Sequence, residues 1–221
     1  MVAPTADQNG RAPFIVFEGG DGAGKTTQIN RLADRLRETG RSVLMTREPG
    51  GSPGAEDIRA LIVSGDPDRY TALSETLLVY AARHDHLTRT INPARARGEI
   101  VLCDRFSDST RAYQGHAGQV DLEVIETIDG LVVDGDGPDL TIVLDAGLVE
   151  ATSRATNRGG TEDRFERKGA GFQKAVINGF RTIATANPKT HILIDANRSI
   201  GEIHQDIWDA VSTRFHLVSG A

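Results

Sequence analysis

The sequence predicts an α/β fold in which a five-stranded parallel sheet is flanked by helices on both faces. Five short apolar runs alternate along the chain with stretches of helical periodicity, which is the pattern of a doubly wound parallel sheet. The first apolar run leads into a glycine-rich loop and then a helix, the arrangement of a phosphate-binding loop. That loop reads Gly19-Gly20-Asp21-Gly22-Ala23-Gly24-Lys25-Thr26.

Size and composition indicate one domain. The chain has 221 residues, of which 38% are hydrophobic, and we expect a single domain over residues 13–221 after a flexible tail over residues 1–12. The formal charge of −6 argues against a nucleic-acid-binding surface. No apolar stretch reaches the length of a membrane span and no signal-peptide core is visible, so we expect a soluble cytoplasmic protein without membrane contact.

The elements follow in order from their patterns. Strands are predicted over residues 14–18, 42–46, 100–104, 140–145 and 191–194. Helices are predicted over residues 25–40, 55–64, 73–96, 122–133, 148–156, 172–183 and 203–211, and the pair Asn92-Pro93 can kink the third. We expect a polar loop from Asp104 to Gly118. The glycine-rich, charged stretch over about residues 154–171 is predicted to be a short mobile lid.

The glycine-rich loop predicts a nucleoside triphosphate site. Its glycines allow backbone conformations in which successive N–H groups converge on one anion, and the following helix adds the positive end of its dipole. Lys25 would reach the β- and γ-phosphates, and the Thr26 hydroxyl would ligate Mg²⁺. The predicted ATP-binding residues are Gly19, Gly20, Asp21, Gly22, Ala23, Gly24, Lys25, Thr26 and Thr27.

Charged residues follow three predicted strands, where ligands bind in such sheets. Asp104 ends an apolar strand, as expected for a carboxylate that holds Mg²⁺ directly or through water. Arg47 and Arg105 add positive charge beside a triphosphate site. A second anionic substrate explains both arginines, which favours phosphoryl transfer to a phosphorylated acceptor.

Five further motifs stand in the order in which they occur in thymidylate kinases, and the sequence resembles that family over nearly its whole length. They are Thr46-Arg47-Glu48-Pro49-Gly50-Gly51, Tyr80-Ala81-Ala82-Arg83, Asp104-Arg105-Phe106, Ser109-Thr110-Arg111-Ala112-Tyr113-Gln114-Gly115 and Pro138-Asp139-Leu140-Thr141. The resemblance implies the P-loop nucleoside monophosphate kinase fold and a homodimer. It also implies ATP- and Mg²⁺-dependent phosphorylation of dTMP to dTDP for dTTP synthesis.

The resemblance also implies roles for matching residues. Asp21 would accept a hydrogen bond from the dTMP 3′-hydroxyl, and Arg47 and Arg105 would clamp its phosphate. Arg83 would face the thymine edge with Thr110 nearby. The dTMP-binding set is Asp21, Arg47, Glu48, Pro49, Arg83, Arg105, Thr110, Tyr113 and Gln114, with Tyr113 under the sugar and a cis bond between Glu48 and Pro49.

Two positions depart from the family pattern. Val79 stands where an aromatic residue often stacks on thymine, with Tyr80 one step on. Gly22 occupies a loop position where some members carry a catalytic arginine, which is typical of the subtype whose lid supplies it. Arg158 is our first choice for that catalytic contact, with Arg154 binding ATP. We therefore predict that Lys25, Asp104, Arg105 and Arg158 are catalytic residues. Thr26 and Asp104 are also the predicted residues that hold Mg²⁺.

Other functions stay open at this level. Another small P-loop kinase, acting on a different nucleotide or on a nucleoside, shares the loop; a nucleoside kinase would not need Arg47 and Arg105 around an acceptor phosphate. A nucleotide-dependent switch or partitioning ATPase is a more remote alternative. The guanine motif N-K-x-D of GTPase switches is absent from the sequence.

Overall fold

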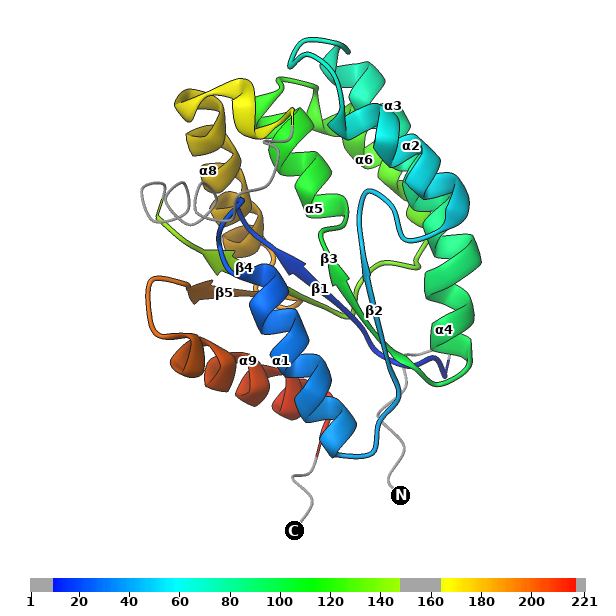
Figure 1. Cartoon of the computed structure of the whole chain (residues 1–221), viewed down its shortest axis with the longest axis vertical. Helices are drawn as coiled ribbons and strands as arrows, with labels where there is room; N and C mark the ends of the chain where they lie inside the picture. The colour runs from blue at the N-terminus through cyan, green and yellow to red at the C-terminus, as the bar shows by residue number, and fades with distance from the viewer. Residues whose placement is uncertain (1–9, 148–163, 218–221) are drawn as a thin grey trace.

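A parallel sheet of five strands, in the order β2-β3-β1-β4-β5, runs through the centre of the molecule (Figure 1). The structure is a computed structural model that describes residues 10–147 and 164–217. The strands are β1 (Phe14–Glu18), β2 (Val43–Arg47), β3 (Ile100–Asp104), β4 (Leu140–Asp145) and β5 (His191–Asp195). The predicted five-stranded parallel sheet is confirmed.

Helices cover both faces of the sheet. On one face lie α1 (Lys25–Glu38) and α9 (Ile200–Arg214), whose Leu32 and Trp208 belong to the same buried cluster as Ile15 and Phe17 of β1. The alternate β1 residues, Phe14 and Val16, belong to a second cluster on the opposite face. Both faces of the central strand are therefore buried, which explains why its sequence is a continuous apolar run.

The opposite face carries the remaining helices (Figure 1). They are α2 (Pro53–Val63), α3 (Ala72–His86), η1 (Leu87–Ile91), α4 (Asn92–Ala96), α5 (Ser107–Thr110), η2 (Arg111–Ala117), α6 (Leu122–Val133), η3 (Glu166–Lys168) and α8 (Ala170–Ala186). The helix predicted over residues 148–156 lies outside the described residues, as do residues 1–9 of the tail predicted over residues 1–12 and most of the lid. None of the helices in the described ranges is long and apolar enough to cross a bilayer.

The long helix predicted over residues 73–96 is continuous through its proline. The segment η1 is a π-helix, and it connects α3 directly to α4, where Pro93 occupies the first turn. The wider π-turn gives room for the proline ring, which in a regular α-helix would clash with the carbonyl four residues back. The potential kink at Asn92-Pro93 is thus accommodated by a change of helix type.

The prediction of a polar loop from Asp104 to Gly118 is wrong. Residues 107–117 form α5 and η2, two short helical segments in direct succession. Their sequence lacks helical apolar periodicity because Ser107, Asp108, Thr110 and Gln114 are buried polar residues rather than solvent-facing ones. Polar residues that are buried in a site do not produce the amphipathic pattern by which helices are recognised.

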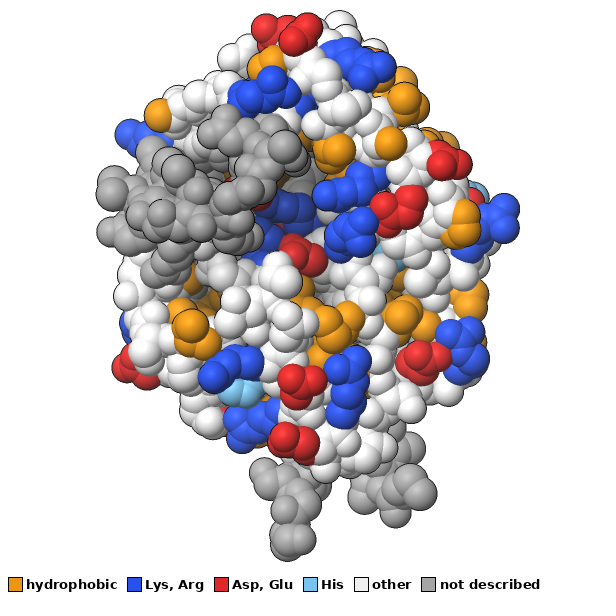
Figure 2. All heavy atoms as spheres, in the orientation of Figure 1, with side chains coloured by type: hydrophobic (Ala, Val, Ile, Leu, Met, Phe, Trp, Pro, Cys, Tyr) orange, Lys and Arg blue, Asp and Glu red, His pale blue; other side chains and the backbone are white. Residues whose placement is uncertain are grey.

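The strand register brings the carboxyl ends of three strands, which precede or carry predicted site residues, to one edge of the sheet. Phe17 lies beside Asp104, and Asp104 lies beside Arg47, so the carboxyl ends of β1, β3 and β2 meet at one edge. Figure 2 shows Lys and Arg side chains gathered around a hollow on this face.

Candidate active site

A cavity of about 210 Å³ lies beyond the carboxyl ends of the strands. Most of the predicted site residues line it. They are Asp21, Gly22, Gly24, Lys25, Thr26, Arg47, Glu48, Pro49, Arg83, Asp104, Arg105, Thr110, Tyr113 and Gln114. Gly19, Gly20, Ala23 and Thr27 do not line this cavity, and Thr27 is exposed on the first turn of α1. The wall is completed by the apolar residues Ile62, Val63, Val79, Phe106 and Phe165, and by Arg59 and Ser109.

The glycine-rich loop joins β1 to α1 and wraps around the Lys25 ammonium. Gly19 has a φ of 134°, and a Cβ there would lie 2.4 Å from the Leu144 carbonyl oxygen, so only glycine fits. Lys25 Nζ donates to the Gly19 and Gly20 carbonyls, each at 3.0 Å. Burial lowers the pKa of Lys25, and the nearby Arg105 guanidinium lowers it further, against the carboxylates of Asp104, Asp21 and Glu18.

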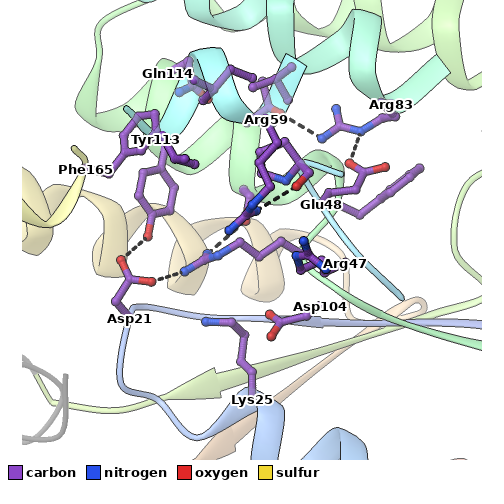
Figure 3. A pocket seen from close by; sticks show the side chains of 18 of the residues that line it. Asp21, Lys25, Arg47, Glu48, Arg59, Arg83, Asp104, Tyr113, Gln114 and Phe165 are labelled. Atoms are coloured by element: carbon purple, nitrogen blue, oxygen red, sulfur yellow. Dashed lines mark hydrogen bonds and ion pairs between the residues drawn. The ribbon is translucent and has the colours of Figure 1, made fainter. Parts of the chain in front are cut away.

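Asp21 connects the glycine-rich loop to Arg105 and Tyr113 across the cavity (Figure 3). Its Oδ1 accepts from Arg105 Nη2 at 2.6 Å, and its Oδ2 accepts from the Tyr113 hydroxyl at 3.0 Å. Burial alone would raise the pKa of Asp21, but Arg105 and Lys25 outweigh it and lower the pKa to about 2. The carboxylate is therefore ionised at neutral pH, and it contacts both Arg105 and Tyr113.

Arg105 itself is held from three sides. Besides Asp21, its Nη1 donates to the Gly19 carbonyl and to Ser109 Oγ, each at 3.1 Å. Its φ of 72° is unusual for a residue other than glycine and costs on the order of 1–3 kcal/mol. These contacts turn the guanidinium back over the loop, so that it faces the same cavity as Lys25.

Thr26 and Asp104 form the part of the site that could hold a divalent cation. Thr26 Oγ1 donates to Asp104 Oδ2 at 3.3 Å. The other oxygen, Asp104 Oδ1, is buried and has no hydrogen-bond partner among the described residues. Among residues 10–147 and 164–217, no three His, Cys, Asp or Glu side chains are grouped so that they could hold a metal ion. An orphaned carboxylate beside a hydroxyl fits Mg²⁺, which usually takes only one or two protein oxygens beside phosphates.

Arg83 lies at the opposite end of the cavity, on α3. Its Nε donates to Glu48 Oε2 at 2.8 Å, and its Nη2 donates to Thr110 Oγ1 at 3.1 Å. Glu48 also contacts His86 Nδ1 at 3.1 Å, and the Glu48-Pro49 bond is cis, as predicted. Arg83 Nη1 is buried without a partner among the described residues. A buried, unpaired donor that lines a cavity is a candidate contact for a ligand.

Tyr80 lies outside the cavity, although its neighbour Val79 is part of the cavity wall. Val79 lines the cavity, whereas the Tyr80 hydroxyl donates to Asp129 Oδ1 of α6 at 3.0 Å and is not part of the lining. Tyr80 therefore does not replace the aromatic residue that Val79 lacks. The aromatic rings that line the cavity are those of Phe106, Tyr113 and Phe165. Phe165 packs edge-on against Tyr113, with 5.6 Å between the ring centroids.

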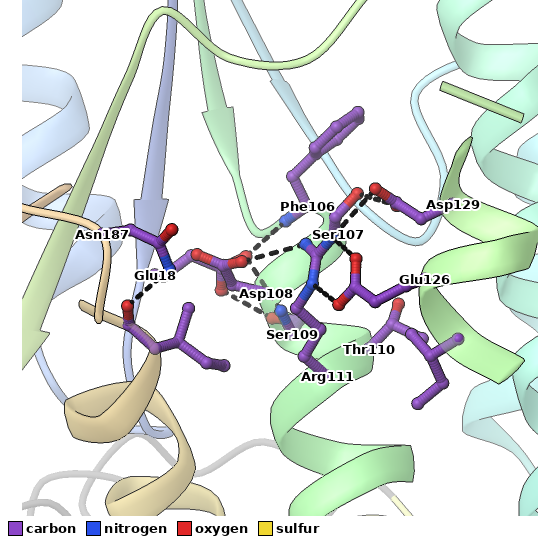
Figure 4. Close-up of polar contacts among 12 residues, drawn as sticks. Glu18, Phe106, Ser107, Asp108, Ser109, Thr110, Arg111, Glu126, Asp129 and Asn187 are labelled. Atoms are coloured by element: carbon purple, nitrogen blue, oxygen red, sulfur yellow. Dashed lines mark hydrogen bonds and ion pairs between the residues drawn. The ribbon is translucent and has the colours of Figure 1, made fainter. Parts of the chain in front are cut away.

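Two contributors were missed by the sequence reasoning. Arg59 of α2 lines the cavity and donates from Nη1 to the Pro49 carbonyl at 2.7 Å; no motif marks it. Glu18 is fully buried at the end of β1 and accepts from the backbone N–H groups of Phe106 and Ser109 at 2.7 and 3.0 Å (Figure 4). Its signal was visible, because it ends an apolar strand just as Asp104 does.

Glu18 supports the loop that carries Arg105. Its second oxygen accepts from Ser109 Oγ at 2.6 Å, and the same hydroxyl oxygen accepts from Arg105 Nη1. Burial, and then the neighbouring Asp108 carboxylate, raise the pKa of Glu18 to about 7. The residue thus links the end of β1 to the guanidinium through one hydroxyl.

The predicted lid contains four arginines; two of them lie among the described residues and two do not. Arg154 and Arg158 lie outside the described residues. Arg164 is completely buried and forms an ion pair with Glu75 at 2.5 Å. Arg167 donates to the Gly65 carbonyl at 2.5 Å. Neither Arg164 nor Arg167 lines the cavity.

The parallel sheet, the glycine-rich loop and the carboxylate at the end of the adjacent strand define the class of P-loop nucleotide-binding proteins. The family model for thymidylate kinase matches residues 17–207. The thymidylate kinase of Caulobacter vibrioides is 49% identical over 204 residues, covering 92% of this chain and 98% of the relative. That of Dinoroseobacter shibae is 52% identical over 195 residues, covering 88% and 93%.

A solved structure agrees with these sequence comparisons. The crystal structure of thymidylate kinase from Ehrlichia chaffeensis superposes with a TM-score of 0.72 at 33% identity, covering 91% of this chain and 99% of that one. The chain belongs to the thymidylate kinase family. The resemblance inferred from the motifs is thereby confirmed.

Proposed function

We propose that this chain transfers the γ-phosphoryl group of ATP to dTMP, giving ADP and dTDP for dTTP synthesis. The observation that carries the proposal is one cavity, lined by Lys25 and the glycine-rich loop at one end and by Arg83 at the other. Arg83 Nη1 has no hydrogen-bond partner among the described residues. Arg47 and Arg105 line the cavity too. One cavity therefore offers positions for a triphosphate, an acceptor phosphate and a base.

The residues of the donor end bind the triphosphate and its charge. Backbone N–H groups of the loop and the Lys25 ammonium hold the β- and γ-phosphates. Mg²⁺, when bound beside Thr26 and the orphaned Asp104 Oδ1, neutralises phosphate charge. Arg158 of the lid is the predicted further cation on the transferring group, and Arg154 the predicted contact of ATP.

The acceptor end orients dTMP. Arg105 and Arg47 bind its phosphate, whose oxygen attacks the γ-phosphorus while ADP leaves, so no general base is needed. Tyr113 lies under the sugar, in the place that a ribose 2′-hydroxyl would need. Asp21 accepts from the 3′-hydroxyl with lone pairs that its contacts to Arg105 and Tyr113 leave available.

We further propose a homodimer. Large apolar side chains are exposed on two neighbouring helices, Leu73 and Leu77 on α3 and Leu122, Val124 and Leu131 on α6. Exposed apolar area of this kind on packed helices is typical of a protein interface. Sedimentation of the full-length protein would give twice the chain mass, and a monomer at micromolar concentration would contradict the proposal.

The activity is tested by ADP release, coupled to NADH oxidation, with dTMP, dUMP, dCMP, dGMP, UMP and thymidine as acceptors. We expect the highest kcat/KM for dTMP and no turnover of thymidine. Arg47→Gln should raise the KM for dTMP, whereas the control Arg37→Gln, on the exposed face of α1 beside Asp34, should not. A higher kcat/KM for another acceptor would contradict the proposed function.

A further inference from the structure

The amide of Gln114 is held in one orientation by a buried carboxylate. Gln114 is 3% exposed and lines the cavity, and its Nε2 donates to Glu75 Oε2 at 3.2 Å. A carboxylate oxygen only accepts, so the amide must present its nitrogen to Glu75. The Gln114 carbonyl oxygen is left to accept from a ligand.

Glu75 is itself fixed. It is 1% exposed, and its Oε1 accepts from Arg164 Nη2 at 2.5 Å and from Lys168 Nζ at 3.3 Å. Arg164 is fully buried and donates to the carbonyl oxygens of Ile62 at 3.0 Å and Pro67 at 3.2 Å. The Oε1 atom of Glu75 is thus held by two cations, and its Oε2 accepts from Gln114 Nε2.

We propose that Glu75 is a positioning residue that sets the base specificity of the site by fixing the Gln114 amide. The inference rests on the proposed function. Gln114 and Arg83 both line the cavity. The Gln114 oxygen is an acceptor, and Arg83 Nη1 is a buried donor with no partner among the described residues. Thymine and uracil present an N3–H donor beside the O4 acceptor, which matches this pair. Cytosine presents the reverse, an N3 acceptor beside an amino donor.

The same carboxylate connects Gln114 to the described part of the predicted lid, residues 164–171. Phe165 lies between Arg164 and Lys168 in sequence, lines the cavity and packs edge-on against Tyr113. The Glu75–Arg164 ion pair therefore links the Phe165 wall to the Gln114 amide. Substitution of Glu75 should loosen both, with the amide giving the specific signal.

The test is the ratio of kcat/KM for dTMP over dCMP in a double-mutant cycle. In Glu75→Gln the residue at position 75 can donate as well as accept, so the Gln114 amide can turn its nitrogen to cytosine N3, and the ratio should fall about tenfold. Arg83 still opposes the cytosine amino group, so some preference for dTMP remains. In a Gln114→Leu background the same Glu75→Gln change should leave the ratio within about twofold.

Controls separate a specific effect from a general one. Lys168→Met removes a partner of Glu75 Oε1 but leaves the contact to Gln114, so the ratio should stay unchanged. If Glu75→Gln does not fold by circular dichroism, Glu75→Asp keeps the charge beside Arg164 and withdraws it from Gln114, and should lower the ratio likewise.

Two results would overturn the inference: an unchanged ratio in the folded Glu75 variant, or an equal fall in both backgrounds. A wild-type chain that prefers dCMP or a purine nucleotide would overturn the proposed function instead. The two failures are therefore distinguishable in one set of measurements.

Discussion

Glu18 should make the stability of this protein fall as pH rises toward neutrality, and Glu18→Gln should remove that dependence. The carboxylate is completely buried and accepts from Phe106 N, Ser109 N and Ser109 Oγ. Glutamine has nearly the same shape, and its Oε1 can accept from both backbone groups. The substitution therefore removes the titration while it keeps most of the packing.

The size and sign follow from the pKa. Burial and the Asp108 carboxylate raise the pKa of Glu18 from 4.5 to about 7 in the folded protein. Between these two pH values the folded state holds a proton that the unfolded state has released, so the free energy of unfolding falls as pH rises. At about 1.4 kcal/mol for each pH unit between the two pKa values, the loss between pH 5 and pH 8 is roughly 2–3 kcal/mol.

Urea unfolding at pH 5 and pH 8 measures this. Wild type should lose roughly 2–3 kcal/mol more stability over that interval than Glu18→Gln, because other titrating groups cancel in the difference. Glu123→Gln, which removes one exposed carboxylate from α6, is the matched control for loss of a negative charge. Equal pH dependence of wild type and Glu18→Gln would refute the reasoning.

Four further outcomes are expected. Lys25→Ala should keep the fold but retain less than about a tenth of kcat, because its ammonium acts on phosphates; circular dichroism and ADP release check this. Tyr113→Ala should reduce the kcat/KM preference for dTMP over its ribo analogue by roughly 1–3 kcal/mol. Val79→Phe should improve dTMP binding by about 0.5–1.5 kcal/mol through ring contact, whereas a raised KM would show that the cavity lacks room. Arg158→Ala should lower kcat by roughly 10²–10⁴-fold with little change in the KM for dTMP, and a fall under about tenfold would move the role to another residue.

The sheet was predictable because each central strand is buried on both faces and therefore has a continuous run of apolar residues. The β1 residues Phe14 to Phe17 are all buried, and Val101, Leu102 and Cys103 of β3 are as well. The edge strands are less buried, and there the bounds moved by one residue, to Val43–Arg47 and His191–Asp195. The glycine-rich loop was predictable for a different reason, since its conformation restricts which residues can occupy it.

The α5–η2 segment was not predictable from periodicity, because its buried side is polar. Tyr113 and Gln114 were assigned to the site through a motif, yet the sequence contains no sign that they stand on a helix. Tyr80 shows the converse limit. Adjacent residues on a helix point in different directions, and only the packed structure shows that Val79 faces the cavity while Tyr80 contacts Asp129.

Two carboxylates, Glu18 and Glu75, were not predicted as site residues, although Glu18 ends an apolar strand as Asp104 does. In a chain with 31 acidic residues, any single Glu is expected to be solvated. Both are buried instead, and a buried carboxylate persists only when donors surround it. Those donors come from distant positions: Ser109 is 91 residues from Glu18, and Arg164 is 89 residues from Glu75. Spacing cannot predict such pairs, but their burial identifies them. Each accepts from a group next to the cavity: Glu18 from Ser109, which also contacts Arg105, and Glu75 from the Gln114 amide nitrogen.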